Sequence, residues 1–132
     1  GDDGLTLPML SVGATGGISV VANVEPERTC AMVGAALSGN FDRARELHHE
    51  LGPLMRALFT ETNPIPVKEA MHIRGHHAPE LRSPLGRLAP EYREDLAAVL
   101  DDLDDFERER YDDGDDEAGE DVADDRIAEV DS

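Results

Sequence analysis

One short β-branched run, Ile18-Ser19-Val20-Val21, lies in a chain whose other patterns are helical. Its length and composition are typical of a buried strand. A single strand of four residues cannot satisfy its own backbone N–H and C=O groups, so it needs neighbouring strands. The remaining sequence contains no second run of this kind. The pattern therefore predicts that the partner strands, and an upstream segment that leads into the loop Gly1-Asp2-Asp3-Gly4, lie outside these 132 residues.

Helical patterns account for most of the rest of the chain. Apolar residues at steps of three and four predict an amphipathic helix over 41–59, with a kink or a local break at Pro53. Asn63 is expected to cap the following helix, which should end at Arg74-Gly75. The expected helices, separated by a loop at 76–89, cover residues 5–12, 26–38, 41–59, 64–74 and 90–110.

The acidic charge is concentrated at the end of the chain. Residues 1–100 contain 13 Asp and Glu against 9 Lys and Arg, whereas residues 101–132 contain 17 against 3. The last 32 residues therefore carry −14 of the net charge of −18, with little apolar surface to offset the entropy of ordering. Three parts are expected: 1–39, the end of a larger α/β unit; 40–110, a helical domain; and 111–132, a disordered acidic tail.

Composition also excludes several classes of function. The acidic balance argues against binding to nucleic acid, which needs a basic patch, and against binding to anionic membranes. A single cysteine, Cys30, allows no internal disulfide, and no apolar run approaches the roughly 18 residues that span a bilayer. We therefore expect a cytoplasmic protein. One lysine against eleven arginines, with abundant carboxylates, predicts adaptation to high salt.

The residues that could hold a metal or attack a substrate lack the required spacing. The glycines at 13–17 precede the predicted strand, whereas a phosphate-binding loop follows one. Cys30 lies in a helical pattern with apolar neighbours, which predicts a packed thiol. No metal site and no cofactor are predicted, and surface positions are expected for the histidines His48, His49, His72, His76 and His77.

Lys68, the only lysine, is the remaining candidate for covalent chemistry. An amine forms an imine with a keto acid only when part of it is deprotonated. Lys68 lies one turn into a predicted helix and is followed directly by Glu69. Because a nearby carboxylate favours the charged ammonium, the sequence predicts that Lys68 is not catalytic.

Three stretches of the sequence, taken in order, are similar to one enzyme family. They resemble the C-terminal part of dihydrodipicolinate synthase, a lysine-imine (Schiff base) lyase of the N-acetylneuraminate lyase superfamily. The resemblance covers about residues 1–106. The matching stretches are Gly1-Asp2-Asp3, Gly16-Gly17-Ile18-Ser19-Val20-Val21-Ala22-Asn23-Val24 and Asn63-Pro64-Ile65-Pro66-Val67-Lys68.

The resemblance implies an α/β fold, a (β/α)8 TIM barrel followed by a helical C-terminal domain. This chain would then contain the end of strand 7, helix 7, strand 8 at 18–21 and helix 8 at 26–38, with the appended helices at about 41–106. The fragment itself would be mostly α.

The resemblance also implies an activity. The family condenses pyruvate with aspartate semialdehyde in lysine and diaminopimelate biosynthesis, and commonly forms homotetramers. The imine-forming lysine would precede Gly1, so no catalytic residue is expected in this chain, which by itself should be inactive. Ile18 and Gly1 would lie at the pyruvate pocket, and Asp2, Ser19 and Asn63 near the second substrate.

Two alternatives remain open at this point. One is a 2-keto-3-deoxy sugar acid aldolase of the same superfamily, which would share the pyruvate half of the site and differ in its second-substrate residues. The other is a non-catalytic product of a truncated or split gene, acting as a helical interaction module.

Overall fold

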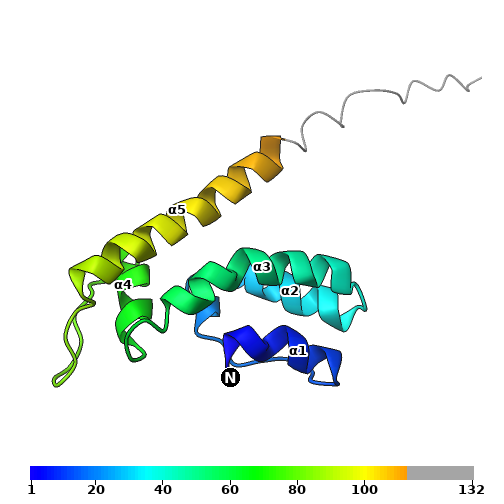
Figure 1. Ribbon diagram of the computed structural model, residues 1–132, viewed down its shortest axis with the longest axis horizontal. Coiled ribbons are helices and arrows are strands. Elements are labelled where there is room, and N and C mark those ends of the chain that lie inside the picture. Colours follow the sequence, from blue (N-terminus) through cyan, green and yellow to red (C-terminus); the bar gives the residue numbers. More distant parts are fainter. Residues whose placement is uncertain (113–132) are drawn as a thin grey trace, which may run out of the picture.

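The computed structural model of the chain describes residues 1–112, and within them the secondary structure is entirely helical (Figure 1). In chain order the elements are the 3-10 helix η1 (Asp3–Leu5), α1 (Thr6–Ser11), the 3-10 helix η2 (Val21–Asn23), α2 (Pro26–Leu37), α3 (Phe41–Ala57), α4 (Ile65–Ile73) and α5 (Pro90–Asp112).

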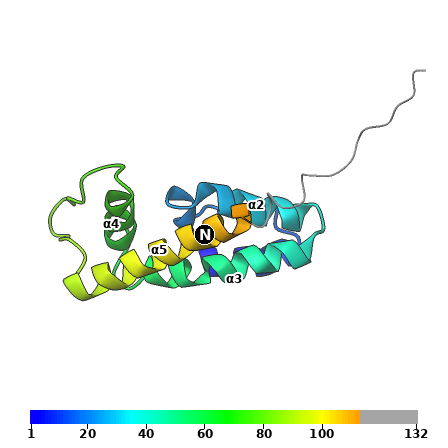
Figure 2. The ribbon, with the colours of Figure 1, turned by 90° about the horizontal axis from the view of Figure 1, so that it is seen from above.

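Helices α2 and α3 form the centre of the structure as an antiparallel pair (Figures 1 and 2). The turn between them contains Gly39, whose φ of +84° is accessible to glycine without the strain that a Cβ would add. Helix α1 packs against this pair on one side, and the long α5 crosses α3 on another. Helix α4 lies near the start of α5, at the end of the pair where α3 finishes.

The predicted amphipathic pattern of α3 forms the middle of the core. Leu47, Leu51, Leu54 and Leu58 share one face at steps of three and four, and each is at most 1% exposed. Apolar residues from α2 and α5 pack against this face and complete one continuous cluster, among them Met32, Ala36, Leu96, Leu100 and Leu103.

The segment predicted as a strand, Ile18–Val21, forms no β-strand here, and residues 1–112 contain none elsewhere. Ile18 is 88% exposed, and the segment ends in η2, where only Val21 is fully buried. The physical reason is the one that the sequence suggests: residues 1–112 offer no second strand to pair with this one. The α/β part of the predicted fold class is therefore not seen here, whereas the mostly helical part is.

Three local predictions also need correction. Helix α3 continues through Pro53, so of the predicted kink or break the break does not occur; leucines on both sides of Pro53 are buried in the core. Asn63 does not cap α4, which begins at Ile65 with Pro64 as its N-cap and without a side-chain hydrogen bond to its first N–H groups. Cys30 is exposed, because it lies on the outer face of α2.

The remaining boundaries agree with the expected ones. Helix α4 ends at Arg74-Gly75, where Gly75 has a φ of +79°, and Pro90 opens α5. The predicted disordered tail lies outside the described residues from position 113 onward.

Candidate functional site

Asp3 fixes the segment that carries two of the predicted substrate residues. Its carboxylate is nearly buried and accepts hydrogen bonds from the Ser19 hydroxyl, from the Val20 N–H at 3.0 Å and from the Val21 N–H at 3.1 Å. The Ser19 hydroxyl oxygen in turn accepts the Ala22 N–H at 3.0 Å. These bonds hold the run after Ile18 against the first loop of the chain.

Asp2 is placed differently from Asp3, although the two are adjacent. Its side chain is exposed and accepts the Gly4 N–H at 3.0 Å, which caps η1. Gly1 and Asp2 line an open hollow of about 560 Å³, whose other wall comes from the end of α3. That wall consists of Met55, Arg56 and Phe59.

Asn63 lines a second hollow, of about 320 Å³, between α4 and the η2 segment. Val20 and Asn23 form one side of it, and Lys68 lies on the other. The Asn23 amide donates to the Val20 carbonyl at 3.1 Å, and the Lys68 ammonium donates to the Glu80 carbonyl at 2.6 Å. The residues that complete the wall are Pro64, Val67, Met71 and His77.

The structure therefore distributes the five predicted substrate residues over two hollows and the segment between them. Gly1 and Asp2 belong to the first hollow and Asn63 to the second, whereas Ile18 lines neither and projects into solvent. Sequence reasoning missed Asp3, which positions Ser19. Its only signal is the pair of adjacent acids, which does not show which of them is buried.

Glu69 does not contact Lys68, contrary to the argument from their adjacency. Its carboxylate is 3% exposed and binds the Arg87 guanidinium at 2.6 and 3.2 Å, with Arg93 at 3.8 Å. The hydrogen bond to Glu69 raises the pKa of Arg87. This cluster attaches the 76–89 loop to α4 and α5, and Lys68 is left beside the loop backbone.

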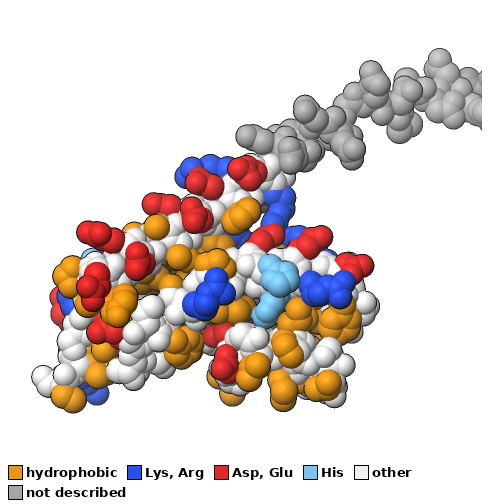
Figure 3. Space-filling model, in the orientation of Figure 1, with side chains coloured by type: hydrophobic (Ala, Val, Ile, Leu, Met, Phe, Trp, Pro, Cys, Tyr) orange, Lys and Arg blue, Asp and Glu red, His pale blue; other side chains and the backbone are white. Residues whose placement is uncertain are grey.

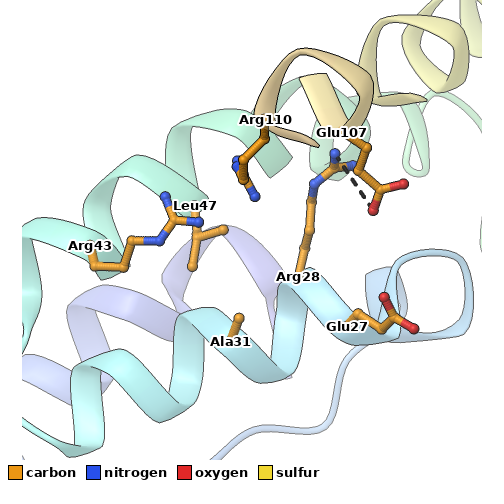
Figure 4. Close-up of a pocket in the computed structure, with 7 residues that line it drawn as sticks. All are labelled: Glu27, Arg28, Ala31, Arg43, Leu47, Glu107 and Arg110. Carbon is orange, nitrogen blue, oxygen red and sulfur yellow. Dashed lines mark ion pairs between the residues drawn. The ribbon is translucent and has the colours of Figure 1, made fainter. Parts of the chain in front are cut away.

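A third hollow, of about 260 Å³, lies between α2, α3 and α5 and contains none of the predicted residues (Figure 4). Its arginines pair with carboxylates: Arg43 with Glu46 at 2.8 Å, and Arg110 with Glu50 at 2.7 Å. Figure 4 shows Arg28 at the α5 end of this hollow, paired with Glu107 at 3.9 Å. All three arginines of this hollow are paired with carboxylates, so the region holds helices together and offers no unpaired cation to a ligand.

Arg28 belongs to a buried ionic cluster that joins α2 to the other helices. It is 4% exposed, contacts Glu25 at 3.2 Å and donates to the Leu103 carbonyl at 2.6 Å. Glu25 also pairs with Arg74, which reaches Asp104 at 2.9 Å. Burial raises the pKa of Glu25, although Arg74 and Arg28 both act to lower it.

The histidines do not assemble into a metal site in the part of the chain that is described. Among residues 1–112 no three His, Cys, Asp or Glu side chains come together as ligands, and the His72 ring faces the His77 carbonyl at 3.1 Å. None of the helices described is long and apolar enough to cross a bilayer.

We expect Asp3→Ala to lower the free energy of unfolding by about 2–3 kcal/mol, because one hydroxyl and two backbone N–H donors lose their shared acceptor. Urea unfolding followed by circular dichroism measures this change. Amide hydrogen exchange at Val20 and Val21 should accelerate in the same variant. Asp2→Ala is the control and should cost about 1 kcal/mol or less. Equal losses in the two variants would contradict the role given to Asp3.

Solved structures that share this arrangement of helices are barrel enzymes of the lyase class. The 4-hydroxy-tetrahydrodipicolinate synthase of Methylacidiphilum fumariolicum matches with a TM-score of 0.80 and 44% identity, over 85% of this chain and 37% of that one. The dihydrodipicolinate synthase of Thermotoga maritima matches with a TM-score of 0.78 and 43% identity, over 79% of this chain and 35% of that one.

The chain belongs to the dihydrodipicolinate synthetase family, whose profile matches residues 1–103. The 4-hydroxy-tetrahydrodipicolinate synthase of Haloarcula marismortui is 72% identical over 100 residues, which are 76% of this chain and 33% of that protein. The enzyme of the same name from Natronomonas pharaonis is 64% identical over 103 residues, which are 78% of this chain and 35% of that protein. The chain thus spans about a third of the length of these relatives.

Proposed function

We propose that this chain is the C-terminal third of a lyase that condenses pyruvate with aspartate semialdehyde through a lysine imine. The observation that carries the proposal is the 72% identity to a 4-hydroxy-tetrahydrodipicolinate synthase, sustained over 100 residues. The imine-forming lysine would come from a part of the complete protein that these 132 residues do not include, so the chain alone would be inactive.

Within this proposal, Ile18 and Gly1 contribute to the pyruvate pocket. The Ile18 side chain is 88% exposed, and Asp3 holds its segment in place. It is therefore positioned to be covered by the substrate or by a part of the complete protein outside residues 1–112. Asp2, Ser19 and Asn63 face the second substrate in the complete enzyme. The hydroxyl of Ser19 is already engaged by Asp3, so its contribution is to position the segment as well as to contact substrate.

In the complete protein, residues 18–21 would be the eighth strand of the barrel, α2 the eighth barrel helix, and α3 to α5 the appended helical domain. The apolar surface supports this placement. Leu5, Met9 and Val12 remain exposed along the outer side of the η1–α1 segment, where apolar side chains gather in Figure 3. Exposed apolar side chains grouped in this way are typical of a face that another part of the protein, or another subunit of a homotetramer, covers. A salt-adapted, cytoplasmic enzyme remains our prediction for the complete protein.

Borohydride trapping with pyruvate tests the proposal. The complete protein should form a reduced pyruvate adduct, which intact-mass spectrometry detects, and the 132-residue chain should form none. Lys68→Arg in the complete protein is the control and should keep the adduct, because Lys68 is not the imine-forming residue. An adduct on Lys68 in the short chain, or no adduct in the complete protein, would contradict the proposal.

A further inference from the structure

An ion pair joins the two sides of the second hollow. Glu25 comes two residues after η2, whose segment forms one side of this hollow. Arg74 is the C-cap residue of α4, which forms the other side. The Arg74 guanidinium donates to the Glu25 carboxylate, and no other ion pair within residues 1–110 connects the η2 segment with α4. The pair thus links the two walls through the residues that follow them.

The Glu25 carboxylate is a fixed point on the η2 side. Its backbone N–H donates to the Val21 carbonyl at 2.9 Å, and its carbonyl accepts the N–H of Thr29 at 3.1 Å and the hydroxyl at 2.7 Å. The residue is 7% exposed, and Arg28 holds the other carboxylate oxygen at 3.2 Å. A side chain that is buried and bonded in this way has little freedom to follow a moving partner.

Arg74 is held from two directions. Besides Glu25 it binds Asp104 of α5 at 2.9 Å, and its side chain is only 25% exposed. A guanidinium has a rigid planar fork of N–H donors, so one arginine can hold two carboxylates in a defined geometry. The Arg74 backbone N–H donates to the Ala70 carbonyl at 3.0 Å, which keeps the residue on the helix. The position of this guanidinium therefore determines where the end of α4 lies.

The position of α4 in turn determines the shape of the second hollow. Helix α4 has nine residues and moves as one rigid unit. Its first turn has no side-chain cap hydrogen bond, so the helix is not fixed by a cap at the end near Asn63. Asn63 and Lys68 line the hollow from this helix and the turn before it. A change at the Arg74 end therefore moves both of them relative to η2.

We propose that Glu25 and Arg74 are a positioning pair, which sets the separation of the two walls of the second hollow and thereby the affinity for the second substrate. The proposal rests on the proposed function for the presence of that substrate beside Asn63. Neither Glu25 nor Arg74 lines this hollow, so the pair acts through the segments that it holds and not by touching the substrate. Arg28 and Asp104 support it from α2 and α5.

Kinetics of the complete protein test the role of the pair. Arg74→Met keeps an unbranched side chain and removes the charge and the donors. It should raise the KM for aspartate semialdehyde about fivefold or more, and leave kcat and the KM for pyruvate within about twofold, because Ile18 and Gly1 lie outside this hollow. Glu25→Gln should act in the same direction. Arg74→Lys should recover part of the loss, since its ammonium restores the charge without the planar fork.

Arg110→Met is the matched control for these measurements. Arg110 pairs with Glu50 at 2.7 Å, which joins α5 to α3, and it does not line the second hollow. Both KM values should stay within about twofold of the unmodified protein, because neither wall is attached through this pair. The proposal is overturned if Arg74→Met and Glu25→Gln leave the KM for aspartate semialdehyde unchanged, or if they raise the KM for both substrates alike.

Amide hydrogen exchange of the 132-residue chain measures the link between the walls without any substrate. The N–H groups of Val24 and Glu25 both donate to the Val21 carbonyl at 2.9 Å. Their exchange in Arg74→Met should accelerate about tenfold or more beyond that of the buried Leu54 amide, which reports opening of the whole core. In Arg110→Met this excess should be absent. Equal acceleration at all three amides in Arg74→Met would reveal a general loss of stability and would contradict the positioning role.

The two levels of proposal can fail separately. If the complete protein turns over aspartate semialdehyde and Arg74→Met leaves its KM unchanged, the positioning role is wrong while the proposed function stands. If the complete protein does not accept this substrate, the proposed function is wrong, and hydrogen exchange still decides whether Arg74 holds the η2 segment.

Discussion

Arg28→Ala is expected to lower the free energy of unfolding by about 3–5 kcal/mol, measured by urea unfolding at pH 7. Arg28 is 4% exposed. Its guanidinium makes an ion pair with Glu25, donates a hydrogen bond to the Leu103 carbonyl and lies 3.6 Å from the Glu50 carboxylate. Its removal takes one of two cations away from the buried Glu25 carboxylate, which keeps only Arg74, and it removes the guanidinium donor from the Leu103 carbonyl.

The matched control for this variant is Arg45→Ala. Arg45 makes an ion pair with Asp42 at the same spacing along a helix, but both side chains are largely exposed. We expect a loss of about 0.5 kcal/mol or less, because solvent screens exposed pairs. Similar losses in the two variants would show that burial of Arg28 does not determine its contribution.

The effect of Arg28→Ala should also depend on pH. Burial already raises the pKa of Glu25 above its ordinary value of 4.5, and Arg28 is one of the two cations that oppose this. Without Arg28 the pKa of Glu25 in the folded protein rises further, so the folded state binds the proton more tightly than the unfolded state. A carboxyl group whose pKa is higher in the folded than in the unfolded state increases the free energy of unfolding as the pH falls. The deficit of the variant should therefore be smaller at pH 5 than at pH 7, and a deficit that grows on acidification would contradict this assignment.

Leu51→Ala is expected to cost about 2–5 kcal/mol of the free energy of unfolding, measured in the same way. Leu51 is fully buried at the middle of α3, where α2 and α5 both pack, so the cavity left by truncation cannot be filled without moving a helix. Leu51→Met keeps the volume and should cost less than about 1.5 kcal/mol. If Leu51→Ala lowered the free energy of unfolding only slightly, the helices would have moved together to fill the cavity, contrary to this expectation.

The helices were predictable because their signals are local. The steps of three and four in α3, the proline that opens α2 and the glycine after α4 each act within a few residues. The family was predictable for a similar reason, since Asn63 to Lys68 and Gly16 to Val24 are contiguous motifs. The continuity of α3 through Pro53 and the start of α4 at Ile65 did not follow from local signals, because core packing and the exact start of a helix are set by neighbours distant in the sequence.

The candidate site was only partly predictable. Gly1, Asp2, Ile18, Ser19 and Asn63 follow from the resemblance, but their division between two hollows does not. Glu69 shows why adjacency is a weak guide. It follows Lys68 directly, yet successive residues on a helix point in different directions, and its carboxylate binds Arg87 and Arg93 instead.

The sequence by itself determined most of the helical elements and the family, and it predicted that residues 18–21 need partner strands, none of which occurs in residues 1–112. The tertiary structure decided which charges are paired. It buried Asp3 and exposed Asp2, joined Arg28 to Glu25, and left Lys68 beside Asn63 without a carboxylate in residues 1–110. The difference is physical: helix periodicity and turn residues act over a few positions, whereas charge pairing depends on which side chains meet when distant helices pack.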